Sequence, residues 1–226
     1  MDRHTTQGRI VTSIERVHPQ IVQQFKQFYT GIVLDALGKH GTMHVDIGPL
    51  RPGLTMCGPA VTALGPDLTV RRMAIDLAEP GDVLVVAEGD VRDYACFGDG
   101  TASRMMTKSM AGVVIDGCTR DAAGLRRLAF PTFCRGVTAR NYHYPAAGDH
   151  GAVNVPVICG GVLVEPGDLI LGDDDGVVVV PRLLAADLAP VVAQRLGNEQ
   201  TVRGSWTTYP PFDVAAELKE RGYTFE

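Results

Sequence analysis

The side chains best suited to chemistry in this chain are an aspartate and, twenty residues later, an adjacent arginine–aspartate pair. Asp99 comes first, and Arg120 and Asp121 follow after residues 100–119. Carboxylates are ligands that hard divalent cations prefer, and a guanidinium beside such a cation can bind the anionic oxygens of a keto acid or of its enolate. The pattern therefore indicates metal-assisted chemistry at a carbon–carbon bond.

Each of the three residues also has an ordinary structural interpretation. Asp121 can be the N-cap of a helix expected over residues 122–129, and Asp99 can hydrogen-bond to the start of its own helix. Arg120 can be a solvated surface residue. Their positions next to adjacent predicted elements favour a joint function.

The elements around these residues alternate between strand and helix. Short apolar runs bounded by Gly and Pro predict buried strands at residues 60–64, 82–87, 112–116 and 132–134. Helices are expected over residues 101–110 and 122–129. This order predicts parallel strands, with ligands favoured beyond their carboxyl ends, so Asp99 and the Arg120-Asp121 pair should share one rim of an α/β domain.

The rest of the chain predicts one domain with a helix and a tail at its end. Helical spacing of apolar residues predicts an amphipathic helix over residues 19–39. A strand-and-turn region follows residue 151, in which Asp173-Asp174-Asp175-Gly176 is interpreted as a hairpin turn rather than a calcium loop. A helix is expected from Pro181 to about Thr201. The expected division is an N-terminal segment over 1–18, a domain over 19–204 and a tail over 205–226.

Composition excludes several classes of function. The 226 residues carry a net charge of −5, and no run of Lys or Arg provides the basic stripe that nucleic acids require. Neither a leader pattern nor a membrane-spanning apolar run is found, so we expect a cytoplasmic protein with no nucleic-acid or membrane partner. The five cysteines form no C-x-x-C pair and predict reduced, mostly buried thiols.

Two other kinds of site are disfavoured. A Schiff-base aldolase needs a desolvated lysine, and Lys108, the lysine nearest the motif, is expected to be a solvated helix residue. His40 and His44 have the spacing of metal ligands, but Gly41 between them weakens a helical presentation.

Several segments of the chain together resemble the RraA-like family. They are residues 81–86, the Asp99 to Asp121 motif, residues 113–117, residues 130–138, and residues 164–168 with 173–181. The resemblance covers roughly residues 20–200, and the spaced motif is that of the 4-hydroxy-4-methyl-2-oxoglutarate / 4-carboxy-4-hydroxy-2-oxoadipate aldolase branch. It implies a class II pyruvate aldolase with oxaloacetate decarboxylase activity. It also implies a swivelling β/β/α fold and homotrimers or homohexamers with active sites between subunits.

The resemblance also implies roles for individual residues. Asp121 would anchor Mg²⁺ or Mn²⁺, partly through waters, Asp99 would act in the outer shell of the metal, and Arg120 would bind the pyruvyl oxygens. Gly98, Gly100 and Thr101 are the expected substrate-binding residues, because backbone amides at a helix start suit a carboxylate. Glu199 matches a family glutamate that reaches the neighbouring subunit's site, and it is equally well interpreted as a surface residue. A water ordered by the metal and relayed by Asp99 or Glu199 would take the proton from the substrate hydroxyl.

Two rival functions accompany the aldolase hypothesis. One is a non-catalytic protein-binding regulator, since the family is named for an inhibitor of a ribonuclease, although a pure binder has no need of Asp99, Arg120 and Asp121 together. The other is a methyltransferase, which no glycine-rich nucleoside-binding loop supports. Gly100-Thr101 and residues 140–144 depart from the family pattern and leave the exact substrate open.

Overall fold

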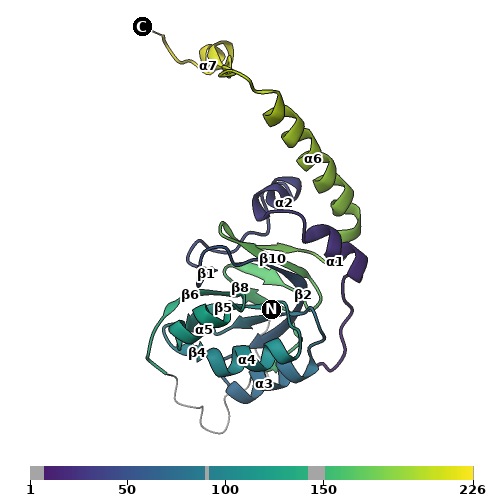
Figure 1. Ribbon diagram of the computed structural model, residues 1–226, viewed down its shortest axis with the longest axis vertical. Helices are drawn as coiled ribbons and strands as arrows, with labels where there is room; N and C mark the ends of the chain where they lie inside the picture. The colour runs from purple at the N-terminus through teal and green to yellow at the C-terminus, as the bar shows by residue number, and fades with distance from the viewer. Residues whose placement is uncertain (1–7, 90–91, 142–150, 226) are drawn as a thin grey trace.

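A curled sheet forms the centre of the protein (Figure 1). The computed structural model describes residues 8–89, 92–141 and 151–225. The strands are β1 (Gly48–Pro49), β2 (Met56–Leu64), β3 (Val83–Ala87), β4 (Ala95–Phe97), β5 (Gly112–Thr119), β6 (Thr132–Val137), β7 (Ala152–Val153), β8 (Val157–Cys159), β9 (Val162–Val164), β10 (Leu169–Asp173) and β11 (Gly176–Val180). The sheet runs in the order β1-β6-β5-β3-β2-β10-β11, with β4 on β5 and β7 on β2, while β8 and β9 form a separate hairpin.

The sheet combines a parallel half with an antiparallel half. Strands β2, β3, β5 and β6 pair in parallel, and β4 joins β5 in the same direction, as the alternation of strands and helices predicts. Strands β10 and β11 continue the sheet antiparallel to β2. Before β1, the Met43 amide donates to the Val177 carbonyl and the Val179 amide donates to the Gly41 carbonyl. This pairing curls the sheet nearly into a barrel.

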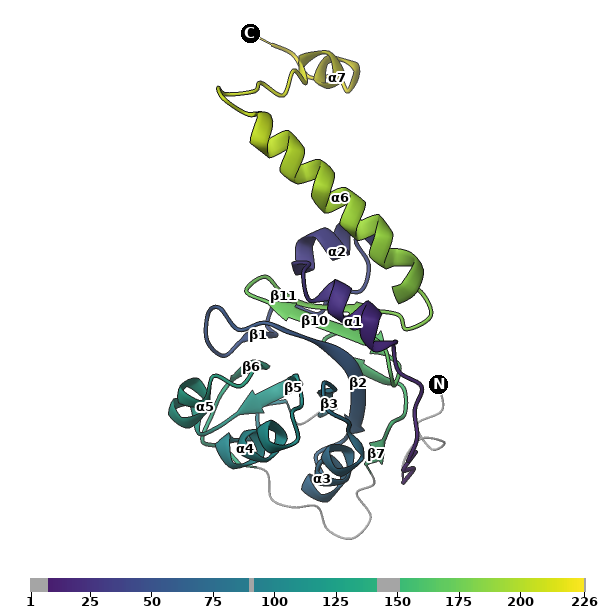
Figure 2. The ribbon, with the colours of Figure 1, turned by 45° about the vertical axis from the view of Figure 1, so that its right-hand side comes forward.

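Two groups of helices cover the sheet on opposite sides (Figures 1 and 2). The helices are α1 (Pro19–Phe25), α2 (Thr30–Ala36), α3 (Leu68–Leu77), α4 (Asp99–Thr107), α5 (Ala122–Leu128), α6 (Ala185–Ser205) and α7 (Ala215–Glu220). Helices α3, α4 and α5 pack on the parallel half, and α1, α2 and the first turns of α6 pack over β10 and β11. The rest of α6 extends away from the body and carries α7 at its far end.

Three apolar clusters stabilise these layers. One fills the inside of the curled sheet around Phe133 and Ile170. A second lies between the sheet and α3–α5 and includes Met105 and Leu125. The third joins α1, α2 and α6 to β10 and β11 and is built around Phe25. Fully burying a side chain of this size contributes about 1.5–3 kcal/mol, so each cluster contributes to the stability of the fold.

The prediction of one helix over residues 19–39 is wrong. The chain forms α1 and α2 with a break at residues 26–29. At the break, Phe25 and Phe28 pack edge to face, and the Asp173 carboxylate accepts hydrogen bonds from the amide and hydroxyl of Thr30, each at 2.7 Å. A carboxylate distant in sequence therefore starts a second helix where the local apolar pattern alone would continue the first.

Smaller differences concern element ends and short elements. Strand β2 begins at Met56 rather than residue 60, and α6 covers Ala185–Ser205 rather than residues 181–201. The elements not predicted are β1, β4, α3 and the tail helix α7. No helix among the described residues is long and apolar enough to cross a membrane. The single α/β domain with a long C-terminal helix is confirmed.

Candidate active site

The parallel pairing of β4 with β5 brings the two halves of the Asp99 to Asp121 motif together. Phe97, at the end of β4, is in register with Thr119, at the end of β5. The Arg120 amide and the Thr119 hydroxyl both donate to the Phe97 carbonyl, each at 2.9 Å. The segments that follow the two strands therefore leave the sheet side by side, and the prediction that they share one rim is confirmed.

Asp121 has an unusual backbone conformation and a carboxylate that makes no capping hydrogen bond. Its φ and ψ of 56° and 35° are left-handed, a region that Asp tolerates better than most residues. Although it occupies the N-cap position of α5, its side chain makes no capping hydrogen bond, so the predicted cap interaction is wrong. The carboxylate is about half exposed, and its ion-pair partner is Arg120, whose Nε lies 3.7 Å from Oδ2.

Two glycines make room for the two carboxylates. Gly98 has an extended backbone that any residue can adopt, but a Cβ at this position would collide with Oδ2 of Asp121. Gly124 in α5 lies in the same way against the Asp99 carboxylate, and a Cβ there would collide with its Oδ2. Both carboxylates therefore rest on bare backbone of the opposite segment.

The start of α4 offers polar groups to a ligand. The Thr101 amide donates to the Gly98 carbonyl at 3.1 Å, whereas the Gly100 amide has no acceptor among the described residues. The Thr101 hydroxyl likewise makes no hydrogen bond within the part of the chain that the structure describes. Of the three predicted substrate-binding residues, Gly100 can contribute an amide and Thr101 a hydroxyl. Gly98 lies against the Asp121 carboxylate instead.

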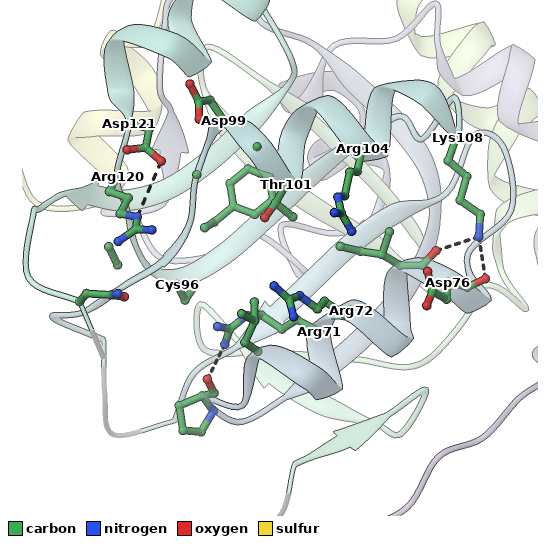
Figure 3. A pocket seen from close by; sticks show the side chains of 18 of the residues that line it. Arg71, Arg72, Asp76, Cys96, Asp99, Thr101, Arg104, Lys108, Arg120 and Asp121 are labelled. Atoms are coloured by element: carbon green, nitrogen blue, oxygen red, sulfur yellow. Dashed lines mark hydrogen bonds and ion pairs between the residues drawn. The ribbon is translucent and has the colours of Figure 1, made fainter. Parts of the chain in front are cut away.

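These groups line a cavity of about 890 Å³ between α3 and α4 (Figure 3). Arg120 and Asp121 lie at one end, Arg72 and Arg104 near the middle, and Lys108 at the other end. Its charged lining residues are Arg71, Arg72, Arg104, Lys108 and Arg120, against Asp76, Asp99 and Asp121. Five cations against three carboxylates give a local excess of positive charge in a chain whose net charge is −5, and such a cavity favours anionic ligands.

Helix α3, which the sequence did not reveal, supplies one wall of the cavity. The Asp67 carboxylate caps this helix by accepting a hydrogen bond from the Thr69 amide at 2.6 Å. The Asp-x-Thr pattern in the sequence could have predicted the helix start. Arg71 is buried and pairs with buried Glu88 at 2.9 Å, while it also donates to the Pro66 carbonyl. Burial raises the pKa of the Glu88 carboxyl, and Arg71 opposes that shift. The pair fixes the inner wall of the cavity.

Glu199 lies far from this cavity within one chain. It is on α6, on the opposite side of the sheet from α4 and α5 (Figure 2). Its carboxylate accepts a hydrogen bond from the Tyr29 hydroxyl at 2.5 Å and pairs with Arg203. These residues line a second cavity of about 660 Å³ between α2 and α6. Action of Glu199 on the Asp121 site requires a second subunit and stays a prediction.

The groups disfavoured as catalysts have structural roles. The Lys108 amine donates to the Ile75 and Asp76 carbonyls at the end of α3, at 2.9 and 2.6 Å. His44 is exposed, and its Nδ1 accepts a hydrogen bond from the Asp46 amide at 3.3 Å. In the predicted hairpin turn, which is confirmed, Asp173 caps α2 and Asp174 accepts from the Gly53 amide at 2.8 Å.

A metal ion at this site would need ligands from outside the side chains. Among the described residues, no three His, Cys, Asp or Glu side chains converge to hold a metal ion. Mg²⁺ commonly binds one or two carboxylates and keeps several waters or substrate oxygens, so the half-exposed Asp121 carboxylate is compatible with such a site. Of the polar segment 140–144, residues 142–144 lie outside the described residues.

The sequence is similar to a known family and to several named proteins. The family model described as RraA-like, Aldolase/RraA, matches residues 30–179. A protein of Halalkalibacterium halodurans named "Putative 4-hydroxy-4-methyl-2-oxoglutarate aldolase" is 39% identical over 165 residues, which cover 71% of this chain and 76% of that one. A protein of Burkholderia multivorans with the same name is 34% identical over 143 residues, 62% of this chain and 85% of that one.

Solved structures show the same architecture. A Streptomyces coelicolor protein, RraAS2, described as an unusual member of the RNase ES inhibitor RraA protein family, superposes with a TM-score of 0.72 at 31% identity, over 83% of this chain and 98% of that one. An uncharacterized protein of Pseudomonas syringae gives a TM-score of 0.70 at 27% identity, over 93% and 97%. The fold is therefore that of the RraA-type α/β proteins. This chain belongs to the RraA-like family.

Proposed function

We propose that this protein is a divalent-metal-dependent pyruvate aldolase. Its substrates would be 4-hydroxy-2-oxo acids of the 4-hydroxy-4-methyl-2-oxoglutarate or 4-carboxy-4-hydroxy-2-oxoadipate type, cleaved to pyruvate and a second keto acid. Oxaloacetate decarboxylation would be a second activity, because it yields the same pyruvate enolate. The observation that carries the proposal is the half-exposed Asp121 carboxylate beside the Arg120 guanidinium at the rim of a cationic cavity.

The residues present fit a bound Mg²⁺ or Mn²⁺. Asp121 would hold the ion through a carboxylate that rests against Gly98 and makes no capping hydrogen bond. When bound, such an ion polarises the 2-oxo group and offsets negative charge on the enolate. The family resemblance and the names of the aldolase relatives support this assignment.

The chain's own groups would position the substrate and stabilise the charge that develops. Arg120 donates charge-assisted hydrogen bonds to the pyruvyl oxygens, and this interaction strengthens as the enolate forms. The Gly100 amide and the Thr101 hydroxyl are open donors for the carboxylate of the pyruvyl group. Asp99, whose side chain has no hydrogen-bond partner among the described residues, would accept a proton relayed from the substrate hydroxyl.

The complete site would include a second subunit. The long α6 extends away from the body and carries Glu199, and its far end and tail expose large aromatic side chains, among them Trp206, Tyr209 and Phe212. Exposed apolar groups of this kind commonly mark a protein interface. We propose a homotrimer or homohexamer in which Glu199 completes the site of a neighbouring copy.

The deciding experiment couples pyruvate release to NADH oxidation. Purified protein is offered oxaloacetate and 4-hydroxy-4-methyl-2-oxoglutarate with Mg²⁺, with Mn²⁺ and with a chelator. We expect pyruvate from both acids, lost with the chelator and restored by added metal. Release that is indifferent to chelation would refute the metal-dependent mechanism, and no release from any tested oxo acid would refute the aldolase.

A protein-binding regulator of a ribonuclease is the second candidate. The likeness to RraAS2, described as a member of a ribonuclease-inhibitor family, favours it. A binding measurement with a purified RNase E-type enzyme separates the two functions. Tight binding that slows RNA cleavage, together with no pyruvate release, would support the regulator.

A further inference from the structure

Two arginines near the middle of the cavity have no partner in the described residues. Arg72 extends from α3 and Arg104 from α4, and their guanidinium groups face the same space from opposite walls (Figure 3). Neither side chain makes an ion pair or hydrogen bond within residues 8–89, 92–141 and 151–225. Two guanidinium groups that face one another repel, and an anion bound between them offsets this repulsion. The planar guanidinium group also matches the geometry of a carboxylate.

The other cations of this cavity are already committed. Arg71 is paired with Glu88 behind the wall, and the Lys108 amine is held by two carbonyls of α3. Arg120 lies beside Asp121 at the end of the cavity. Arg72 and Arg104 are therefore the cations left to bind an anion away from the Asp121 carboxylate.

The spacing along α4 sets how far that anion lies from the pyruvyl site. Thr101 and Arg104 are three residues apart, so they share one face of the helix, and both line the cavity. Three residues advance about 4.5 Å along a helix. When the pyruvyl carboxylate of a short oxo acid binds at the start of α4, a carboxylate at the other end of the acid therefore lies beside Arg104.

We propose that Arg72 and Arg104 form a subsite for the distal carboxylate of the substrate, which selects oxo acids with an acidic group at the end remote from the pyruvyl unit. This inference rests on the proposed function, since it uses the pyruvyl position assigned there. It concerns specificity and leaves the chemical step to Arg120 and Asp121.

A matched pair of non-cleavable ligands tests the subsite without turnover. 2-Oxoglutarate and 2-oxopentanoate differ only in the distal carboxylate, and their affinities are measured by calorimetry in the presence of Mg²⁺. We expect the wild type to bind 2-oxoglutarate about tenfold or more tightly than 2-oxopentanoate. The double variant Arg72→Gln, Arg104→Gln should bring this ratio close to one while the affinity for 2-oxopentanoate stays unchanged.

A control variant and three outcomes complete the test. Arg127→Gln on the exposed face of α5 removes one positive charge outside the cavity and should keep the wild-type ratio. Equal binding of the two acids by the wild type, no binding of either, or a ratio that survives the double substitution would each overturn the subsite. If the wild type binds the two acids equally and binds inorganic phosphate at Arg72 and Arg104, the two arginines form a site for a free anion instead. A smaller oligomer for the double variant with an unchanged ratio would assign them to a subunit contact.

The same measurements separate this inference from the proposed function. A wild type that releases no pyruvate but shows the expected ratio would keep the subsite and refute the aldolase. A wild type that releases pyruvate but binds both acids equally would keep the aldolase and refute the subsite.

Discussion

Arg120 is the residue whose loss should affect chemistry most with least effect on the fold. Its side chain is about half exposed, and its ion pair with Asp121 is long, at 3.7 Å. The substitution Arg120→Ala should lower kcat for pyruvate release about 10²–10³-fold, the usual effect of removing a donor to a developing oxyanion. The thermal midpoint should stay close to that of the wild type, because exposed ion pairs contribute little to stability. Full activity in this variant would remove Arg120 from the mechanism.

Gly98 should be intolerant of a single methyl group for a reason specific to Asp121. Its backbone is extended, so alanine is not strained there, but the added Cβ would displace the Asp121 carboxylate. We expect Gly98→Ala to lower kcat/KM on the order of 10²-fold, the cost of a small misplacement of a catalytic group.

A matched substitution shows whether that effect is local. A Cβ at Gly48 in β1 meets no atom within 4 Å, so Gly48→Ala should retain wild-type kcat/KM and stability. If Gly98→Ala keeps activity and metal dependence, Asp121 is not held in place by the bare backbone of Gly98.

At the scale of elements, the start of α2 depends on the turn between β10 and β11. Asp173 accepts from both the amide and the hydroxyl of Thr30, so Asp173→Ala should destabilise the fold by about 1–2 kcal/mol, as the loss of a helix cap does. Asp175 is the neighbouring control, because its exposed side chain makes no hydrogen bond or ion pair among the described residues. Urea unfolding that gives the same midpoint for Asp173→Ala and Asp175→Ala would contradict the cap.

The strands carry buried or partly buried thiols that should be unreactive. Cys57, Cys96, Cys118, Cys134 and Cys159 all lie on strands and are free. Burial raises the pKa of Cys57 to about 12 and that of Cys134 to about 11, above the ordinary 9.0. Because the thiolate is the reactive form, labelling of native protein by a chromogenic disulfide reagent should be slow at pH 8 and should rise with pH beyond 9.

Unfolded protein provides the reference for this reaction. In urea the same reagent should label the thiols rapidly at pH 8, and pyruvate release should survive brief labelling of the native protein. Rapid loss of activity together with labelling of one native thiol would place that cysteine at the active site.

The elements also show what the sequence could and could not predict. Apolar runs such as residues 112–116 and 82–87 predicted the buried parallel strands, because both faces of these strands are covered. The break between α1 and α2 was missed because Asp173, more than a hundred residues away, causes it. Asp121 was assigned correctly to a helix start, but its left-handed backbone and the contact of its carboxylate with Gly98 could not be predicted from residue type. Arg72 and Arg104 line one cavity because α3 and α4 lie on the same side of the sheet, which no local pattern in the sequence records.

For the whole molecule, subunit mixing tests whether Glu199 acts in a neighbouring site. Arg120→Ala and Glu199→Gln chains should each be weakly active alone, since every site of either homo-oligomer lacks one group. If the site lies between copies, co-expression should restore about a quarter of wild-type activity, because random assembly in a symmetric oligomer joins both intact groups at one site in four.

Two controls make the mixing experiment decisive. Mixing either variant with itself should restore nothing, and light scattering should show the same oligomer for all samples. Activity of the mixed sample no greater than the average of the two variants would confine Glu199 to its own chain, where it pairs with Tyr29 and Arg203.

The register of β4 on β5 has a consequence for recognising distant relatives and for engineering. The interval from Asp99 to Arg120 consists of α4, a turn through Ser109 and β5, and the pairing of β4 with β5, which sets Phe97 opposite Thr119, aligns its two ends. An extra residue in the turn lengthens the interval without moving either end, whereas a deletion within β5 shifts the alternation of its side chains. The count of twenty is thus a by-product of the lengths of one helix and one strand. A search that demands this count will overlook proteins with the same strand pairing and a longer turn.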